Sequence, residues 1–454
     1  ASNSFYLLGL EDENGKYLKA NYLEEFSDLP NGLIVLQMRQ EFSDLITIVP
    51  DEHVNANPIP QSIYQVVEGY ESGQLERCAI IDFLNRSKPV IKNYKEGPIA
   101  SSNDPNQRLQ QVINAVKNLD NSYLTIQGPP GSGKSHTGKH IIAELVKTGA
   151  KIGVSSNSHK AINNLLLSTA KFCREEGINA TFACTKETEP ELIDAGVSIL
   201  NNNNLTNHVE PGCVLGTTAW GFSRDDMSEQ LDYLFVDEAG QVSIANLVAM
   251  SRSSKNLVLM GDQMQLGQPS QGTHPAESGQ SILDYLLQDT PTISNDMGVF
   301  LGTTYRMHSA VNQFISTHIY DGKLESHPDN DKRTIKVPND YKGILNKEAG
   351  IIFSAVCHEG NTQASDEEVA EIETMVNQLL GRTFTELSDK SRPVTLDDML
   401  FVAPYNHQVS KLKQVFGSQA KVGSVDKFQG QEAPIVFLSM CASDASESPR
   451  GLDF

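Results

Sequence analysis

The residue types with the clearest chemistry form a glycine-rich run that ends in a lysine and a serine. This run, GPPGSGKS, follows the apolar segment Tyr123 to Gln127 and precedes the amphipathic segment His140 to Lys147. Glycines in this order let backbone amides point into one concavity, while the lysine reaches phosphate oxygens and the hydroxyl binds magnesium. The pattern predicts an ATP and Mg²⁺ site in which Lys134 is catalytic and Ser135 is a metal ligand. The expected nucleotide contacts are Gly128, Pro129, Pro130, Gly131, Ser132, Gly133, Lys134, Ser135 and His136.

Two adjacent carboxylates follow another apolar run. Asp237 and Glu238 come directly after Tyr233 to Val236, where Asp237 can hold magnesium through water and Glu238 can polarise an attacking water. A capping role remains the alternative for this pair. Gln263 follows the apolar run Leu257 to Met260, so we expect its amide beside Glu238, sensing the γ-phosphate as a further catalytic residue.

The segments that must position these residues alternate between apolar runs and helical patterns. The first set of apolar runs is Tyr123 to Gln127, Ile152 to Ser155, Cys213 to Thr217, Tyr233 to Val236 and Leu257 to Met260. A second set begins near Val299 and continues through Ile351 to Phe353, Leu400 to Ala403, Val422 to Val425 and Ile435 to Met440. Such alternation is typical of a parallel, doubly wound sheet. The predicted fold class is α/β, with two such domains in tandem.

We divide the chain into three predicted parts. Residues 1–100 should form a β-rich accessory module with a helical stalk, because short β-type runs such as Phe5 to Gly9 precede helical patterns. Residues 101–292 should form the first α/β domain, and residues 293–454 the second, incomplete at its C-terminus. The polar, asparagine-rich stretch 186–211 interrupts the first domain, and we expect an inserted excursion or a mobile loop there.

Composition limits the partners. The 454 residues suffice for about three domains, and no apolar run approaches the roughly 20 residues of a membrane span, so no membrane partner is expected. The six cysteines are scattered without a C-x-x-C pair, which predicts reduced thiols and a cytoplasmic location. The net charge of -21 argues against a polyanionic partner, although a local basic groove can hold a strand on an acidic surface.

Five sequence blocks lie in a fixed order along the chain: NSHKAINNLL, DEAGQVS, GDQMQLGQP, TTYRMH and VDKFQGQEAP. With the phosphate loop they resemble the motifs of superfamily 1 helicases, in the branch that includes the nonsense-mediated-decay helicase. They are most similar to the helicase half of a bacterial family that pairs a RecB-like nuclease with such a motor. The resemblance covers about residues 120–454. It implies two RecA-like P-loop domains with ATP between them, and movement along single-stranded DNA or RNA, 5' to 3'.

The resemblance also implies roles for single residues. Arg306 is expected to be an arginine finger on the second domain, stabilising the γ-phosphate only when the two domains close. Tyr305 is expected to stack on adenine, Glu432 to reach the ribose and Gly430 to offer its amide near the phosphates. The competing interpretations are an ion-paired arginine, a core aromatic and a helix cap.

Two further sets of contacts follow from the resemblance. Gln107 is the candidate for a glutamine that reads adenine, with Gln110 and Gln111 as competitors. Short polar loops are expected to contact the phosphates and sugars of a strand, with turn formation as the alternative and a structural role open for the histidine. These positions are Ser156, Asn157, His159, Thr217, Thr218, Pro404, Tyr405, Asn406, Ser424 and Asp426.

Two expectations concern parts of the motor and of its relatives. The resemblance implies another catalytic arginine beyond Phe454, so we expect a fragment of a longer protein that binds nucleotide but turns it over weakly. No Glu-x-Lys triplet occurs, and the Asp-x-Lys triplets at Asp321 and Asp340 lie within the motor region. We therefore expect no strand cleavage by this chain, and a nuclease domain elsewhere on the full-length chain.

Two other classes of function compete with a helicase. An ATP-gated clamp that binds a partner, without unwinding, would suit the acidic charge. A nucleotide or small-molecule kinase would explain the phosphate loop but neither the second α/β domain nor Arg306.

Overall fold

The computed structural model describes residues 4–11, 16–28, 32–38, 46–51, 57–75, 77–187, 189–267, 274–428 and 430–443. The chain divides into two compact units, Ala1–Asn57 and Pro58–Phe454. None of the six cysteines forms a disulfide. Within the described ranges, no helix combines the length and the apolar character that crossing a membrane requires.

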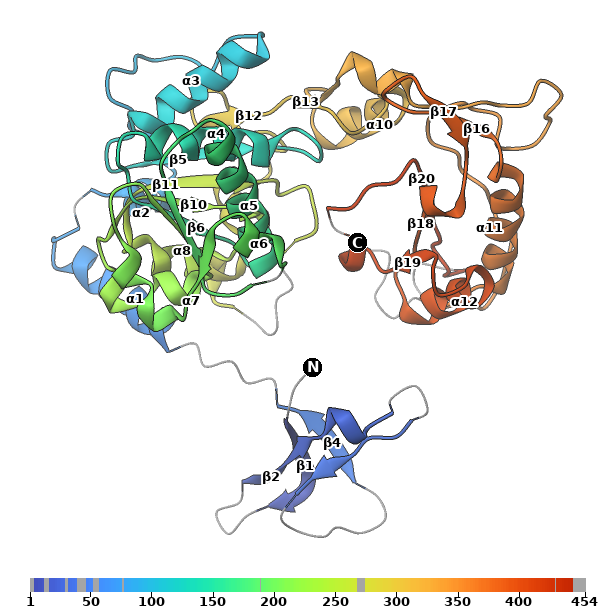
Figure 1. Cartoon of the computed structure of the whole chain (residues 1–454), viewed down its shortest axis with the longest axis horizontal. Helices are drawn as coiled ribbons and strands as arrows, with labels where there is room; N and C mark the ends of the chain where they lie inside the picture. Colours follow the sequence, from blue (N-terminus) through green and yellow to red (C-terminus); the bar gives the residue numbers. More distant parts are fainter. Residues whose placement is uncertain are drawn as a thin grey trace. The chain divides into compact units, whose positions relative to one another are not determined.

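The first unit is an antiparallel sheet of four strands in the order β3-β2-β1-β4 (Figure 1). Leu7 of β1 and Ala20 of β2 are fully buried within it. The predicted β-rich module is therefore confirmed. Its elements are β1 (Ser4–Glu11), β2 (Tyr17–Tyr22), the 3-10 helix η1 (Glu24–Phe26), β3 (Leu36–Gln37) and β4 (Thr47–Pro50).

The two helices that follow belong to the second unit. α1 (Pro58–Glu71) packs on α8 (Ile244–Ser251), and the hydroxyl of Ser62 donates to the carbonyl of Ala249 at 2.6 Å. α2 (Ala79–Leu84) buries most of its side chains in the same core. The helices occur as predicted, but they are not a stalk of the accessory module, because their apolar faces bury against the first α/β domain.

The first α/β domain contains eight parallel strands in the order β12-β5-β11-β10-β6-β9-β7-β8. Parallel neighbours need crossover connections, and helices supply most of them, as the alternating pattern predicted. The strands are β5 (Tyr123–Gln127), β6 (Ile152–Ser155), β7 (Thr181–Cys184), β8 (Val197–Ile199), β9 (Cys213–Gly216), β10 (Leu231–Val236), β11 (Ser254–Gly261) and β12 (Gly298–Phe300).

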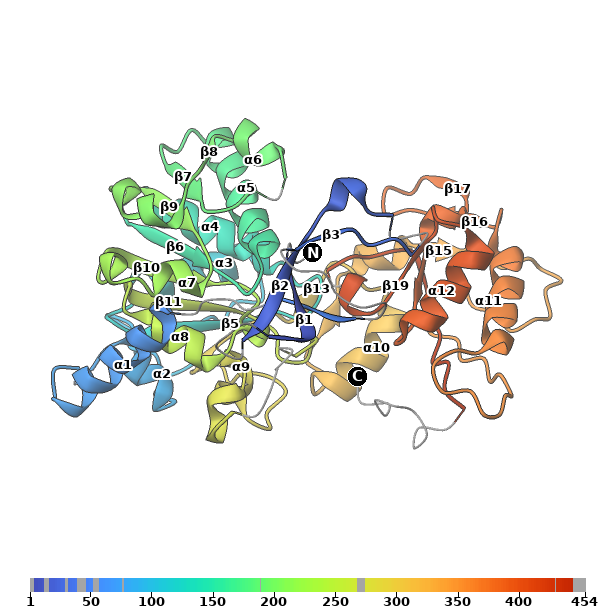
Figure 2. The same ribbon diagram turned by 90° about the horizontal axis from the view of Figure 1, so that it is seen from below.

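Helices cover both faces of this sheet (Figures 1 and 2). One core lies between the sheet and α3 (Pro105–Lys117), α4 (Lys134–Val146) and α5 (His159–Glu175). The other lies between the sheet and α1, α2, α7 (Ala219–Phe222), α8 and α9 (Ile282–Leu287). Because side chains alternate along a strand, Leu124 of β5 enters the first core and Tyr123 the second. The predicted doubly wound arrangement is confirmed.

Of the two alternatives expected for the stretch 186–211, the structure agrees with an inserted excursion and not with a mobile loop. The stretch holds α6 (Glu191–Asp194) and β8, which pairs with β7 and extends the sheet. Leu192, Ala195, Val197 and Leu205 are buried, and these apolar side chains anchor a largely polar segment. Short 3-10 helices complete it, η3 (Asn202–Asn204) and η4 (Thr206–His208).

The first domain also extends further along the chain than predicted. β12 pairs with β5, so the boundary predicted at residue 293 falls too early. Beyond it, β13 (Thr303–Thr304) pairs with β14 (Glu325–Ser326), and α10 (Ser309–Ile319) lies between them in the chain. Tyr320 and Leu324 are buried in the core beneath α8 and α9. The 3-10 helix η8 (Pro328–Lys332) ends this segment.

The second α/β domain has a parallel sheet of three strands in the order β19-β18-β20, flanked by α11 and α12 (Figure 1). Its core includes Phe401, whose ring stacks on those of Phe416 and Phe437. The predicted strand at 351–353 is absent from these sheets, and Phe353 is 86% exposed. The elements are β15 (Thr334–Ile335), α11 (Asp366–Leu379), β16 (Thr383–Thr385), β17 (Ser391–Pro393), β18 (Met399–Val402), α12 (Asn406–Phe416), β19 (Lys421–Gly423) and β20 (Ile435–Leu438).

Candidate nucleotide and strand-binding site

The glycine-rich loop lies between β5 and α4, as its sequence predicted. Gly131 and Gly133 have φ of +73° and +85°, a backbone region that other residues rarely adopt. A Cβ on Gly131 would lie 2.3 Å from the Cβ of Arg306, so this position has no room for a side chain. The loop therefore depends on glycine both for its conformation and for its close packing.

Polar groups of the loop suit an anion. The Oγ of Ser132 is buried and has no hydrogen-bond partner, and Nζ of Lys134 donates to the Gly128 carbonyl at 2.8 Å. Lys134 and Ser135 open α4, whose N-terminal amides carry partial positive charge. An unpaired buried hydroxyl, an ammonium group and a helix N-terminus together fit a phosphate group.

The paired carboxylates lie at the end of β10, two strands away from β5 at the carboxyl edge of the sheet. Asp237 is 6% exposed, and its Oδ1 accepts the amide of Glu238 at 3.0 Å. Burial and the neighbouring Glu238 raise the pKa of Asp237 to about 7, against the opposing effect of Lys134. Glu238 has φ of +51°, a strained conformation that often marks functional residues. A buried carboxylate of this kind fits a divalent cation.

We expect Asp237→Asn to raise the melting temperature of the nucleotide-free chain by a few degrees at pH 8. Because the pKa of Asp237 is raised, stability from its neutral form is fully present below the ordinary value of 3.8 and is lost as pH rises through about 7. Asparagine stays neutral, so its advantage should grow between pH 6 and pH 8. Thermal unfolding across that range, followed by circular dichroism, measures the effect.

Asp232 on the same strand provides the control. Burial alone would raise its pKa, but the Lys151 amide and Lys255 outweigh burial and lower it. A lowered pKa means stability that is present above the ordinary value, so Asp232→Asn should reduce the melting temperature throughout pH 6 to 8. If the melting temperatures of Asp237→Asn and Asp232→Asn shifted equally, the shift could not be attributed to the burial of the Asp237 carboxylate.

Gln263 lies beyond the end of β11, at the predicted edge of the sheet. Its Oε1 accepts from Gln127 at 2.9 Å and its Nε2 donates to the Pro291 carbonyl at 3.0 Å. The amide is thus turned toward β5 rather than toward Glu238. Its role as a γ-phosphate sensor stays a prediction.

The segment around Arg306 packs directly on the glycine loop. Thr304 Oγ1 donates to the Pro130 carbonyl at 2.9 Å, and the Tyr305 amide donates to the Gly131 carbonyl at 2.9 Å. This differs from the expected place of Arg306 on the second domain, because the segment after β13 buries its apolar side chains in the first domain's core. Arg306 therefore lies beside the phosphate loop without any movement of the second domain.

One ion pair links this segment to the second domain. Nε of Arg306 lies 2.6 Å from Oε2 of Glu432, although not in hydrogen-bond geometry. The ion-paired interpretation of Arg306 thus coexists with the finger interpretation. Gly430 is exposed two residues earlier, with φ of +76°.

Tyr305 and Gln107 are the residues predicted to contact adenine. Tyr305 is 47% exposed and packs against the ring of His327, which favours a stacking surface over a core aromatic. Gln107 is exposed in the first turn of α3 and accepts from the hydroxyl of Ser102 at 3.1 Å. Gln111 instead accepts two backbone amides of the preceding loop. The carbonyl oxygens of both glutamines are thus engaged, and the role of Gln107 as the adenine contact stays a prediction.

The residues predicted to contact a nucleic-acid strand differ in how far their side chains are exposed to solvent. Asn157, after β6, and Asn406, after β18, are exposed at the carboxyl ends of their strands. The half-buried positions are His159, Thr218, Pro404 and Ser424. The buried positions, which face away from solvent, are Ser156, Thr217 and Tyr405. The side chain of Asp426 lies outside the described residues, although its backbone begins the 3-10 helix η10 (Asp426–Phe428).

One of these residues, Thr217, has a structural role. The hydroxyl of Thr217 donates to Asn202 Oδ1 at 3.0 Å and accepts from Thr185, which fixes η3. Burial, and then Lys186, lower the pKa of His159. The role of His159 as a contact to a nucleic-acid strand stays a prediction, beside the structural alternative.

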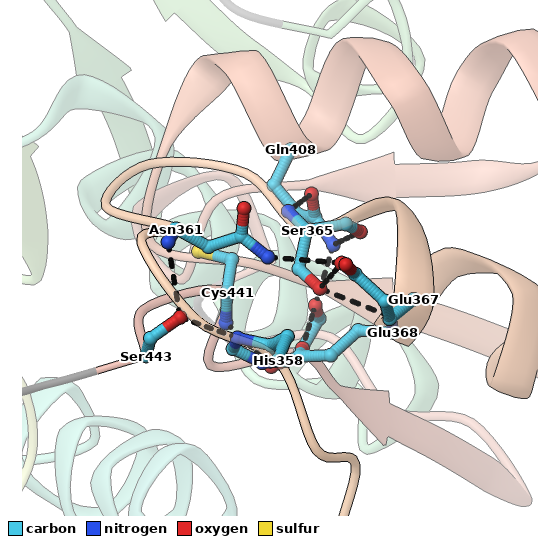
Figure 3. A network of polar contacts seen from close by, with 9 residues as sticks. His358, Asn361, Ser365, Glu367, Glu368, Gln408, Cys441 and Ser443 are labelled. Carbon is cyan, nitrogen blue, oxygen red and sulfur yellow. Dashed lines mark hydrogen bonds and ion pairs between the residues drawn. The ribbon is translucent and has the colours of Figure 1, made fainter.

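A buried polar network, missed by sequence reasoning, supports the loop after β18 (Figure 3). Gln408, in the first turn of α12, accepts from the Ser365 amide at 2.9 Å and donates to the Ser439 hydroxyl at 2.8 Å. Glu368 of α11 accepts from that hydroxyl and from the Cys441 amide. The network thus joins α11, α12 and the end of β20 beneath Asn406.

The same network continues through a histidine. His358 Nε2 lies 3.1 Å from Glu368, and His358 Nδ1 lies 2.7 Å from the hydroxyl of Ser443 (Figure 3). Ser443 also accepts from the Asn361 amide at 3.0 Å. Only Gln408 gave a sequence signal, as a polar residue two positions after Asn406; the other partners lie in two short stretches, 358–368 and 439–443, which are about 70 residues apart.

Comparisons with known proteins identify the two α/β domains. Two family models, each described as an AAA domain, match residues 111–272 and 279–452. The "DNA replication ATP-dependent helicase/nuclease DNA2" of Gallus gallus is 25% identical over 359 residues, covering 75% of this chain and 33% of that protein. The "Putative helicase mov-10-B.1" of Danio rerio is 24% identical over 71% of this chain and 35% of that protein.

Among solved structures, the arterivirus nonstructural protein 10 helicase aligns with 70% of this chain and 52% of its own, at 15% identity and a TM-score of 0.35. The chain spans about a third of the length of the curated relatives it matches. With both AAA domains and the phosphate loop in place, the chain is an ATP-binding P-loop protein. Its sequence is similar to that of the DNA2-type helicase/nucleases at about 25% identity.

Proposed function

We propose that this chain is the ATP-hydrolysing core of a translocase that moves 5' to 3' on single-stranded DNA or RNA. The observation that carries the proposal is the convergence of Lys134, Asp237 and Arg306. Lys134 lies close enough to Asp237 to lower its pKa, and the residues before Arg306 hydrogen-bond to the same loop that Lys134 ends. Two cationic residues next to a glycine loop, with a pair of carboxylates at the same edge of the sheet, suit phosphoryl transfer to water.

The roles of the side chains follow from their chemistry. Lys134 and the loop amides bind the β- and γ-phosphates, and Ser135 and Asp237 are the residues that would hold Mg²⁺. Magnesium, when bound, neutralises phosphate charge. Glu238 orients the attacking water and accepts its proton, while Arg306 offsets charge that develops on the transferred group. Tyr305, Gln107 and Glu432 position the nucleoside.

A translocation assay tests the proposal directly. ATP hydrolysis by the chain should increase when single-stranded oligonucleotides are added, and a label at one end should be displaced in one direction only. Displacement from the 3' end would support the proposed direction. A chain that binds oligonucleotide without displacing any label would instead support the ATP-gated clamp, which the net charge of -21 favours. Neither binding nor stimulation at low salt would contradict both.

We predict that Asn157→Ala and Asn406→Ala each weaken single-strand binding by about three- to tenfold. Each exposed amide can donate to a phosphate oxygen, and a typical hydrogen bond contributes about 0.5–1.5 kcal/mol net of competition from water. Fluorescence anisotropy with a labelled oligonucleotide measures the change. Asn179→Ala is the matched control, because Asn179 is exposed just before β7, at the opposite edge of the same sheet. An equal loss in the control would contradict a strand site at the carboxyl edge.

The DNA2-type relatives are named helicase/nucleases, and we propose that the full-length protein likewise carries a nuclease domain outside residues 58–443. Within the described residues, no group of three or more potential ligand side chains could hold a metal ion. Magnesium-dependent nicking by the full-length protein, and none by this chain, is the expected result.

A further inference from the structure

A buried hydrogen bond connects the segment that carries Arg306 to the end of β11. The hydroxyl of Tyr320 donates to Oδ2 of Asp262 at 2.6 Å, and each residue is 2% exposed. Tyr320 ends α10, and Asp262 directly follows Gly261, the last residue of β11. The contact is therefore a link between two elements that are adjacent to the phosphate loop and distant in the chain.

Asp262 is a buried carboxylate that depends on neutral donors. Besides Tyr320, the side chain of Gln265 donates to it at 3.1 Å and the amide of Met264 at 3.3 Å. Burial, and then Asp262, raise the pKa of Tyr320 above its ordinary value, so the phenol keeps its proton. Loss of the hydroxyl would leave part of a buried charge without a partner, which is costly.

The backbone of Asp262 packs against the turn that carries the catalytic carboxylates. A Cβ on Gly240 would lie 2.4 Å from the carbonyl oxygen of Asp262, and a Cβ on Gly261 would lie 2.6 Å from the amide nitrogen of Ala239. Glu238 precedes these two residues of the turn. Asp262 is thus held in a fixed position against the turn that follows Glu238.

At its other end, α10 is rigidly joined to Arg306. His308 caps the helix two residues after Arg306, accepting the Ala310 amide at 3.1 Å. Asn330 Nδ2 donates to the carbonyls of Thr304 at 2.8 Å and Met307 at 3.0 Å, on both sides of Arg306. Hydrogen bonds therefore hold the segment from β13 to η8 together, and the buried side chain of Tyr320 connects this segment to the end of β11.

We propose that Tyr320 is a positioning residue for ATP hydrolysis: its hydrogen bond to Asp262 sets the position of Arg306 relative to Glu238. The inference rests on the proposed function, because it assigns Tyr320 an effect only through Arg306. Tyr320 itself is buried in the core and touches neither nucleotide nor strand.

Tyr320→Phe keeps the ring in the core and removes only the hydroxyl. We expect kcat for ATP hydrolysis to fall about tenfold, with the Kd for a fluorescent ATP analogue changed less than about twofold. Tyr285→Phe is the matched control, because the Tyr285 hydroxyl donates to the Leu84 carbonyl at 2.6 Å and its ring lies in the same core. The control should lose similar thermal stability with an unchanged kcat. Equal kcat values for the two variants would overturn the inference.

A double variant separates this inference from the function on which it rests. If Tyr320 acts through Arg306, Arg306→Ala and Arg306→Ala with Tyr320→Phe should have the same single-turnover rate. Two effects that multiply would overturn the positioning role while leaving the proposed function intact. An Arg306→Ala variant with unchanged hydrolysis would overturn both.

Discussion

Arg306→Ala should lower kcat for ATP hydrolysis by about 10³-fold or more, with ATP binding retained. An arginine that offsets charge on the transferred phosphoryl group is worth roughly 10³ to 10⁵ in rate. The guanidinium group extends from a segment that hydrogen-bonds to the phosphate loop through the Thr304 hydroxyl at Pro130 and the Tyr305 amide at Gly131. Phosphate release under single-turnover conditions, with saturating ATP, measures the chemical step.

Two further variants test whether the loss of hydrolysis rate is specific to the guanidinium group of Arg306. Arg306→Lys keeps the charge but not the planar group, so an intermediate rate is expected. Arg174→Ala, on the exposed side of α5, removes an arginine that donates to the Asp194 carbonyl and should leave the rate unchanged. A fall below twofold in Arg306→Ala would show that the ion pair with Glu432 is the whole role of this residue.

Glu238→Gln should lower kcat by about 10² to 10⁴-fold, the range typical of a lost general base. Glutamine has nearly the same shape but cannot accept the proton of an attacking water. Because Glu238 holds a left-handed backbone conformation, an isosteric change is needed to keep that strain constant. Steady-state hydrolysis gives the rate, and binding of a fluorescent ATP analogue, expected within about twofold of the original, shows that the site is intact.

Glu229→Gln is the matched control for this change. Glu229 is exposed, also has a positive φ, of +59°, and lies just before the opposite end of β10. Its substitution should change neither rate nor binding. If Glu238→Gln and Glu229→Gln lowered the rate equally, the loss would come from a disturbance of β10 and not from the missing proton acceptor.

The nucleotide site was predictable because its determinants are local. A buried strand, a glycine loop and a helix follow one another within residues 123–146, and the run before Asp237 is equally continuous. Each residue's position at the carboxyl edge then follows from parallel pairing alone. The two-sided packing of the first sheet was predictable for the same reason, since crossover helices must cover both faces.

What sequence reasoning placed wrongly depends on contacts between distant residues. β12 joins the first sheet through pairing with β5, more than 170 residues earlier, roughly the full length of a domain. The attachment of Arg306 to the first domain depends on Tyr320 and Leu324 entering that domain's core. A periodic pattern shows that a segment is apolar on one side, but it does not show which core receives that side.

The side-chain orientations were the least predictable. Tyr405 was expected to contact a strand, yet it is 7% exposed, because the network around Gln408 holds the start of α12 against α11. Likewise, the amide of Gln263 turns to Gln127 because the Pro291 carbonyl lies within reach. Such choices depend on partners that only the folded chain brings together.

The contact between Gly131 and Arg306 has a consequence for how variants at this site would behave. Any side chain at residue 131 would have to displace the arginine's own Cβ, 2.3 Å away, as well as distort the loop. One substitution there would therefore damage ground-state affinity and transition-state charge compensation at once. At this position the two quantities cannot be tuned independently, so an engineered change of nucleotide preference would have to begin at Tyr305 or Gln107 instead.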